Sequence, residues 1–264
     1  MLPAQRREAI LAQVRAQGAA SAEELSRDLG VSVETIRRDL RGLRDQGLLN
    51  RVHGGATRPS HRASEGSFAA RSTLNLARKQ AIAALAASLV SAAETIVIDT
   101  GTTALQLARA LPSSFRGRVL TNSVLVAAEL SDRSDIELLL CGGQIRPGDG
   151  ACSGTHAAAF FADFYADKAF LGAGGVHPEA GLTDHYPAEA VIRRTIAAHS
   201  AAAYVLADSS KLGVIAVHRV CALDQLTAVI TDDEETPGAC AALDAGVTLL
   251  RAAVGGQPSL TAAG

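Results

Sequence analysis

The chain has 264 residues, which is long enough for two domains, a small one and one of roughly 150 to 200 residues. Aromatic residues make up 3% and tryptophan is absent, which disfavours binding of single-stranded RNA, because such proteins stack bases on aromatic side chains. The net charge of -2 is unevenly divided: residues 1–62 carry 11 arginines against seven acidic residues, whereas the remainder carries 14 basic and 20 acidic residues. Any contact with DNA is therefore expected from the N-terminal segment.

Cysteine spacing and hydropathy place the protein in a broad class. The four cysteines show neither a CxxC spacing nor a paired histidine, so no zinc site and no disulfide framework is predicted. The N-terminus lacks a signal-peptide core, and no uninterrupted apolar run approaches the ~18 residues of a membrane span. The sequence therefore predicts a cytoplasmic protein that makes no membrane contact and uses no cofactor.

Three helices are expected near the N-terminus. Residues 3–17 place Ile10, Leu11 and Val14 on one helical face, and Gly18 follows as a stop signal.

Short capped helices follow directly. Ser21 is suited to cap a helix over residues 22–29 that ends at Gly30, and Ser32 is suited to cap the next helix, over residues 33–46. Two short helices joined by a turn of a few residues form a helix-turn-helix.

The third helix carries the arginines that point to DNA. Its apolar stripe of Ile36, Leu40 and Leu43 turns the charged residues of the first turns outward. After it, residues 48–52 favour a strand, and the Gly-Gly turn at residues 54–55 favours a β-hairpin, which would complete a winged helix.

The contacts with DNA can be predicted residue by residue, because the second helix of a helix-turn-helix enters the major groove. The residues predicted to face bases are Ser32, Glu34, Thr35 and Arg38. Those predicted to hold phosphates are Arg37, Arg41 and Arg51, and His53 of the wing is predicted to reach an adjacent groove. One arginine-rich amphipathic helix is often only a solvated face or packs on a partner helix. The ordered combination of two capped helices, a glycine turn and a wing favours the DNA interpretation.

The chain is predicted to be an α/β protein with a boundary after the wing. Residues 1–58 form the DNA-binding domain, and the polar residues 59–75 form a linker without a sustained period. In residues 76–252, β-branched or leucine-rich runs alternate with alanine-rich helical runs, which predicts βα units around a mostly parallel sheet. Residues 253–264 form a tail.

A possible anion site lies after the strand predicted at residues 95–99. Asp99, Thr100, Gly101, Thr102 and Thr103 would lie at the carboxyl end of that strand, with free amides at the start of the next helix, where a phosphate binds well. An ordinary strand-to-helix turn with a threonine cap is the competing interpretation.

Other polar loops are expected at the same edge of the sheet, because the carboxyl ends of parallel strands converge. They contain Asn122 and Ser123, Gly172, and Lys211, whose ammonium group would neutralise a phosphate. A surface lysine after a strand is the more common explanation for Lys211 alone.

The segment EELSRDLGVSVETIRRDLRGLRDQGLLNRVHGGA resembles the DeoR family of bacterial repressors, most specifically in TIRRDL and RVHGGA. The resemblance continues through Phe68, Arg71, Asn75 and Lys79 to about Asp232, and covers nearly the whole chain. It implies a winged helix-turn-helix joined to a sensor domain similar in fold to ribose-5-phosphate isomerase and coenzyme A transferases. It also implies a homo-oligomeric repressor, a dimer or tetramer, of a carbohydrate-metabolism operon, with operator affinity controlled by a phosphorylated sugar.

The resemblance also implies which residues contact the effector. These are Thr100, Gly101, Thr102, Thr103, Asn122, Ser123 and Lys211, while Arg146, Glu189 and Arg193 occupy further motif positions. The chain departs from the family pattern at Gly174, where an acidic residue is common, at His177, and at Arg193, where lysine is frequent. These departures alter the sugar-facing end of the predicted pocket.

Three other classes of protein fit the sequence less well than a repressor does. A sugar-phosphate isomerase with an appended DNA-binding head is the main alternative, and the missing acid at Gly174 argues against it. The GxxxxGK[ST] loop of nucleotide hydrolases is absent, and a DNA-bending protein would not need a second domain with polar loops. Asp184, His185 and His177 are close in sequence, but loop histidines usually stay solvated, so no metal is predicted.

Overall fold

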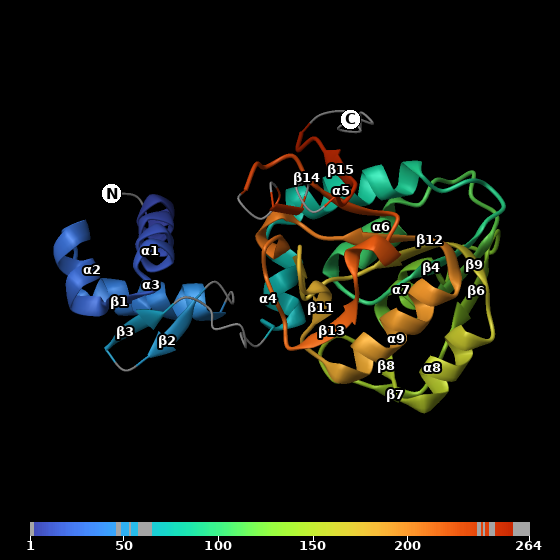
Figure 1. The fold of residues 1–264 in the computed structure, drawn as a ribbon, viewed down its shortest axis with the longest axis horizontal. Helices are drawn as coiled ribbons and strands as arrows, with labels where there is room; N and C mark the ends of the chain where they lie inside the picture. The colour runs from blue at the N-terminus through green and yellow to red at the C-terminus, as the bar shows by residue number, and fades with distance from the viewer. Residues whose placement is uncertain are drawn as a thin grey trace. The chain divides into compact units, whose positions relative to one another are not determined.

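A computed structural model describes residues 3–45, 49–52, 54–57, 65–236, 239, 241–242 and 246–255. The chain forms two compact units, Met1–Leu74 and Asn75–Gly264, and the second begins one residue before the predicted start of the sensor domain. Each unit is described by itself, and its elements are labelled in Figure 1.

The first unit is a small helical domain with a three-stranded sheet. Its elements are α1 (Pro3–Gln17), β1 (Ala19–Ser21), α2 (Ala22–Leu29), α3 (Val33–Asp45), β2 (Asn50–Val52), β3 (Gly55–Thr57) and α4 (Phe68–Thr73). The winged helix is confirmed, since β2 and β3 pair antiparallel behind the helix-turn-helix. The pairing of β1 with β3 was not predicted, because a three-residue Ala-Ala-Ser strand has no sequence signal of its own.

The predicted caps explain where the helices of the head begin and end. Ser21 Oγ accepts a hydrogen bond from the Glu24 amide at 3.1 Å while the Glu24 carboxylate accepts one from the Ser21 amide at 2.9 Å, a reciprocal capping box. Gly30 ends α2 in the left-handed conformation with φ 63°, and Ser32 Oγ accepts from the amide of Thr35 at 3.3 Å. The turn between the two helices is therefore fixed by the left-handed glycine at its start and by the Ser32 side chain at its end.

The core of the head is the stripe predicted from helical periodicity. Ile36, Leu40 and Leu43 of α3 are buried against Ile10 and Val14 of α1. Full burial of such side chains stabilises a fold by about 1.5–3 kcal/mol each, so this stripe fixes which face of α3 is outward.

The predicted linker contains a helix that the sequence analysis missed. The side chain of Ser67 caps α4 by accepting from the amide of Ala70 at 3.3 Å, and Arg71 pairs with Glu65 at 2.9 Å. These local contacts order a segment that has no apolar periodicity.

The second unit is an α/β domain. Its helices are α5 (Leu76–Ser88), α6 (Thr102–Ala110), α7 (Val124–Leu130), α8 (Thr155–Ala162) and α9 (Pro187–Ala198), with the short 3-10 turns η1 (Ser209–Lys211) and η2 (Leu223–Gln225). The main strands are β4 (Thr95–Ile98), β5 (Arg118–Thr121), β6 (Glu137–Leu140), β9 (Ala166–Leu171), β12 (Ser200–Leu206), β14 (Ala228–Asp232) and β15 (Leu249–Ala252). Within the described residues they form one parallel sheet of seven strands in the order β15-β14-β12-β9-β4-β5-β6. The predicted parallel sheet is confirmed.

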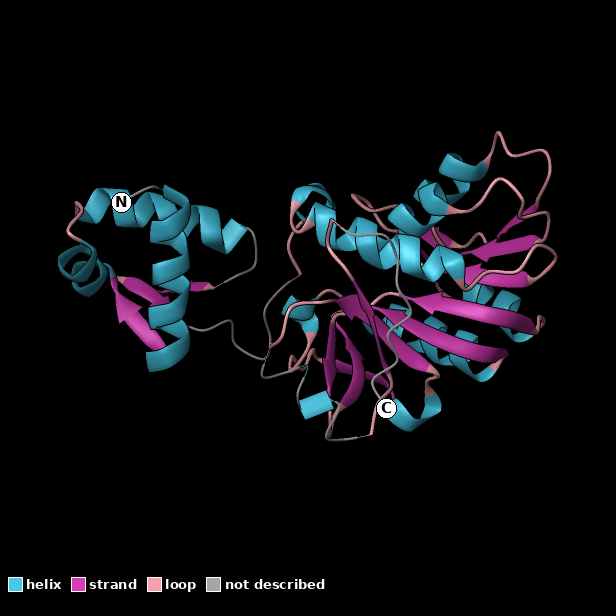
Figure 2. Cartoon of the chain, turned by 90° about the horizontal axis from the view of Figure 1, so that it is seen from above, coloured by secondary structure: helices cyan, strands magenta, loops and turns pink. Residues whose placement is uncertain are grey.

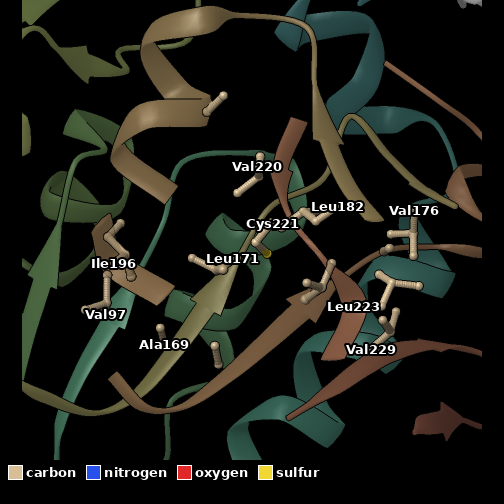
Figure 3. Packing of buried hydrophobic residues seen from close by; sticks show 14 of the residues in the cluster. Val97, Ala169, Leu171, Val176, Leu182, Ile196, Val220, Cys221, Leu223 and Val229 are labelled. Atoms are coloured by element: carbon tan, nitrogen blue, oxygen red, sulfur yellow. The ribbon is translucent and has the colours of Figure 1, made fainter. Parts of the chain in front are cut away.

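Helices cover both faces of this sheet (Figure 2). Alternate residues of β4 show why: Ile96 and Ile98 pack with α5, α6 and α7, whereas Val97 packs with α8 and α9. Figure 3 shows part of the apolar cluster around Val97, in which Leu171 of β9 and Ile196 of α9 are both buried. Two buried layers hold the carboxyl ends of the strands in place.

The second unit also contains short antiparallel strands outside the seven-stranded sheet, and the sequence did not predict them. They are β7 (Gln144–Ile145) paired with β8 (Cys152–Ser153), and β10 (Gly175–His177), β11 (Gly181–Asp184) and β13 (His218–Cys221) in the order β10-β11-β13. Across the described part of the chain, no helix is both long and apolar enough to cross a membrane.

Candidate functional site

The outward face of α3 carries the residues predicted to contact DNA. Glu34, Arg37, Arg38 and Arg41 are exposed, as is Ser32, while Thr35 is partly buried and hydrogen-bonded to Ser32 at 2.9 Å.

The three arginines on this face differ in their partners. Arg41 pairs with Glu34 at 3.1 Å, and Arg37 lies 3.9 Å from Glu34 and 4.0 Å from Glu23. Arg38 forms no ion pair within the described residues, so its guanidinium group is available to a base edge without breaking a contact.

A buried carboxylate fixes α3 against α1. Asp39 is 3% exposed and accepts from Arg6 Nε at 2.6 Å and from Arg7 Nε at 3.0 Å. The two arginines neutralise an acidic side chain that would otherwise repel phosphates, and the three-residue contact sets the orientation of the recognition helix.

Two predicted DNA contacts in the wing stay predictions. Arg51 lies in β2, and only its backbone is described; His53 lies outside the described residues.

In the sensor domain, the order of the strands reverses between β4 and β9. The chain runs from β4 through β5 to β6 on one side, and from β9 through β12 to β14 on the other. Open α/β sheets bind ligands in the crevice at such a switch point, at the carboxyl ends of the strands. Asp99 follows β4, Gly172 follows β9, and the amide of Gly172 donates to Asp99 Oδ2 at 2.9 Å. The predicted loop therefore lies at the point where this fold is expected to bind a ligand.

The backbone of the loop presents the start of α6 to this crevice. Gly101 has φ 131° and ψ 165°, a conformation that is essentially restricted to glycine. No described side chain caps α6, so the amides of its first turn remain for a ligand. An uncapped helix N-terminus with partial positive charge favours an anion.

Several buried polar atoms beside this loop have no hydrogen-bond partner. They are Asp99 Oδ1, Thr100 Oγ1 and both Asn122 side-chain amide atoms. The parallel pairing of Ile98 with Thr121 places Asp99 and Asn122 at adjacent positions one residue further along. Buried polar groups are nearly always paired in folded proteins, so this cluster points to a ligand that supplies both donors and acceptors.

A buried ion network lies behind Asp99 and includes residues predicted to contact the effector. Arg193 donates to Asp99 at 2.5 Å, contacts Asp184, and pairs with Glu189 at 2.9 Å. All four side chains are at most 4% exposed.

Arg146 extends this network toward the surface. It contacts Glu189 and Asp149, and its guanidinium carbon lies 3.8 Å from the centroid of the Tyr186 ring. Arg146 and Arg193 are thus both paired with carboxylates of the same network.

Glu189 is the titratable member of this network. Burial raises the pKa of its carboxyl group from 4.5 to about 7, and the negative charges of Asp184 and Asp99 add to the effect against the opposing charges of Arg193 and Arg146. Between these two pH values the folded protein holds a proton that the unfolded chain has released.

We therefore expect the contribution of Glu189 to stability to fall as the pH rises from about 4.5 to about 7. Wild type should lose on the order of 2–3 kcal/mol of stability between pH 5 and pH 8 through this group, and Glu189→Gln should remove that loss. Urea unfolding of both proteins at pH 5, 6, 7 and 8 measures the difference. Parallel pH profiles for the two proteins would contradict the assignment.

Lys211 lies in η1, after the carboxyl end of β12. Its amide donates to the Asp208 carbonyl at 2.9 Å, and its ammonium group makes no contact with a described acidic residue. A lysine with no neutralising partner at the same edge of the sheet is suited to receive an anion.

Two family models match the chain along most of its length. The DeoR-like helix-turn-helix domain matches residues 6–62, and the DeoR C-terminal sensor domain matches residues 74–233. The chain belongs to the DeoR family of transcriptional regulators. This DeoR-family chain is 33% identical over 234 residues to the HTH-type transcriptional regulator GolR of Listeria innocua, which covers 89% of this chain and 92% of GolR.

Two further relatives also match this chain along most of their own length. The uncharacterized HTH-type transcriptional regulator FruR of Bacillus subtilis is 36% identical over 89% of this DeoR-family chain and 93% of its own. The glycerol-3-phosphate regulon repressor of Escherichia coli is 33% identical over 88% of this chain and 92% of its own. Ribose 5-phosphate isomerase A from Methanocaldococcus jannaschii matches 50% of this chain and 52% of its own at 20% identity, with a TM-score of 0.37.

The structure thus brings together part of the predicted effector site of this DeoR-family protein. The residues at the ends of neighbouring strands are Asp99, Thr100, Gly101, Thr102, Thr103, Asn122, Ser123 and Gly172. Asp184, which sequence reasoning considered only for a metal, is the partner of Arg193.

The departure at Gly174 has a steric reason. A Cβ atom there would lie 2.9 Å from the Asp184 Cα and 3.0 Å from the Thr183 carbonyl oxygen. His177 Nδ1 accepts hydrogen bonds from the amides of Glu179 and Ala180. Within the described residues, no group of three His, Cys, Asp or Glu side chains is arranged to hold a metal ion.

Proposed function

We propose that this DeoR-family regulator represses a carbohydrate-metabolism operon and that a phosphorylated sugar, bound at the carboxyl ends of β4, β5 and β12, controls its affinity for the operator. The chain acts by binding and has no turnover of its own. The observation that carries the proposal is the cluster of buried, unpartnered polar atoms on Asp99, Thr100 and Asn122. Similarity to the glycerol-3-phosphate regulon repressor of Escherichia coli supports a phosphorylated ligand.

Each end of such a ligand has a chemical counterpart in the site. The uncapped start of α6 and the ammonium group of Lys211 suit the phosphate, because both present donors and positive charge. The carboxylate oxygen of Asp99 and the amide of Asn122 suit sugar hydroxyl groups, which donate and accept hydrogen bonds. The ion network of Arg193, Glu189 and Arg146 holds the Asp99 carboxylate in position through the pair between Arg193 and Asp99.

On the DNA side, Ser32, Glu34, Thr35 and Arg38 read bases while Arg37, Arg41, Arg51 and His53 hold the backbone. A homo-oligomer, a dimer or tetramer, presents two such heads to a two-fold symmetric operator. Light scattering of the full chain measures its oligomeric order.

Calorimetry against phosphorylated and unphosphorylated forms of the same compounds tests the sensor half. Glycerol 3-phosphate, glucose 6-phosphate and ribose 5-phosphate are compared with glycerol, glucose and ribose, and any binder is then added to an operator-binding assay. Lys211→Ala should weaken the phosphorylated binder by about 1.5–3 kcal/mol, since a hydrogen bond to a charged group is lost.

Lys168→Ala is the matched control, because this lysine pairs with Glu94 away from the proposed site. Equal affinity for the phosphorylated and unphosphorylated members of every pair would refute the phosphate site. Conversion of ribose 5-phosphate to its ketose isomer would favour the enzyme instead.

A further inference from the structure

The chain passes from the first compact unit to the second at an unusual backbone position. The boundary lies between Leu74 and Asn75, and Asn75 has φ 54° and ψ 32°. It is the only non-glycine residue with a positive φ among the described residues. Asparagine tolerates this left-handed conformation better than most residues, because its short polar side chain can form local hydrogen bonds.

The side chain of Asn75 is used for a distant contact. It stands at the N-cap position of α5 but makes no cap hydrogen bond there. Instead its Nδ2 donates to Asp208 Oδ1 at 3.3 Å, across 133 positions of sequence. The same carboxylate oxygen accepts from the Ser210 amide at 3.0 Å and from the Ser210 hydroxyl group. Asp208 therefore joins the domain junction to the turn that carries Lys211.

A second contact fastens the first turn of α5 to the same turn. Arg78 Nη1 donates to Ser209 Oγ at 2.9 Å and also pairs with Glu234. The Ser209 amide donates to the buried carboxylate of Asp232 at 2.8 Å, at the end of β14. The start of the sensor domain is thus held at two points by the segment that follows β12.

We propose that Asn75 and Asp208 are positioning residues that couple ligand occupancy at η1 to the domain junction. The inference rests on the proposed function, in which Lys211 of η1 contacts the phosphate. A ligand that draws Lys211 toward it reorients η1 and moves Asp208 Oδ1, which accepts from both Ser210 and Asn75, so the hydrogen bond to Asn75 changes with it. The conformational freedom of the residue that joins the DNA-binding head to the sensor then depends on the ligand.

Hydrogen–deuterium exchange of the full-length protein without ligand tests the connection. N75G keeps the left-handed backbone accessible and removes the side chain that donates the hydrogen bond, while D208A removes its acceptor. Each variant should raise the exchange rate in peptides spanning residues 66–82 about fivefold, as loss of one net hydrogen bond implies. The double variant should exchange no faster than D208A, because both changes break the same bond.

Ser72→Ala is the matched control, since among the described residues the Ser72 hydroxyl group donates within α4, to the Ala69 carbonyl oxygen. Wild-type exchange in N75G, or rates in the double variant that equal the product of the single effects, would overturn the connection.

The same experiment with glycerol 3-phosphate as the probe tests the coupling. The probe should change exchange in residues 206–213 and 66–82 of the wild type, but only in 206–213 of N75G. A response confined to residues 206–213 in the wild type overturns the coupling. No response at 206–213 counts against Lys211 as a ligand contact, and the ligand-free measurement still decides whether Asn75 and Asp208 hold the junction.

Discussion

Replacement of Arg193 by methionine is expected to lower the free energy of unfolding of the sensor domain by about 3–5 kcal/mol. The guanidinium group of Arg193 is buried among the carboxylates of Asp99, Asp184 and Glu189. Its loss leaves three acidic groups without their main counter-charge, and an uncompensated buried charge costs more than the pair itself is worth. Urea unfolding of the full-length variant at pH 7 measures the loss.

Two further variants separate charge from shape. Arg193→Lys keeps the charge but loses the planar fork that reaches three carboxylates, so its stability should fall between those of the methionine variant and wild type. Arg109→Met removes an exposed ion pair with Glu129 and should cost less than about 1 kcal/mol. A methionine variant of Arg193 no less stable than the Arg109 variant would show that the network is not holding the domain together.

The helices of the head were predictable because their signals are local. Ser21, Gly30 and Ser32 act within four residues of their own positions, and burial of Ile36 and Leu40 follows from helical spacing. The pairing of β1 with β3 lacked such a signal, since it brings together residues almost 40 positions apart.

The parallel sheet was predictable for a related reason. Strands β4 and β14 are buried on both faces and contain continuous apolar runs, residues 96–98 and 228–230. The antiparallel strands β10, β11 and β13 are only three or four residues long, β10 and β11 each begin at a glycine, and none carries a comparable run. Their existence depends on packing against the main sheet.

In the candidate site too, features formed by neighbouring residues were predictable, whereas contacts between distant residues were not. The loop from Asp99 to Thr103 is one continuous strand-to-helix turn, so its form is legible in the sequence. The partners of Arg193 come from the loop after β4, from β11 and from α9 itself, and only the folded chain brings Asp99 and Asp184 beside it. The family resemblance predicts Arg193 and Glu189 as motif positions, but only the structure shows that they pair with each other.

Replacement of Arg38 by alanine is expected to weaken binding to a selected operator by about 1–3 kcal/mol, on the order of 10- to 100-fold. Arg38 is exposed on α3, and within the described residues it makes no ion pair that DNA would have to displace. Its neighbours Arg37 and Arg41 are both held near Glu34. Fluorescence anisotropy with operator DNA and with a scrambled duplex of equal length measures specific and non-specific affinity separately.

Arg44→Ala serves as the control, because Arg44 is exposed in the last turn of the same helix, away from its DNA-facing start. If Arg38 reads a base, its variant loses affinity for the operator and keeps its affinity for the scrambled duplex. If Arg38 instead holds a phosphate, both affinities fall together and the slope of log affinity against log salt decreases by about one. Operator affinity equal to that of the Arg44 variant would remove Arg38 from the interface altogether, and the recognition of bases would then have to come from Ser32, Glu34 and Thr35.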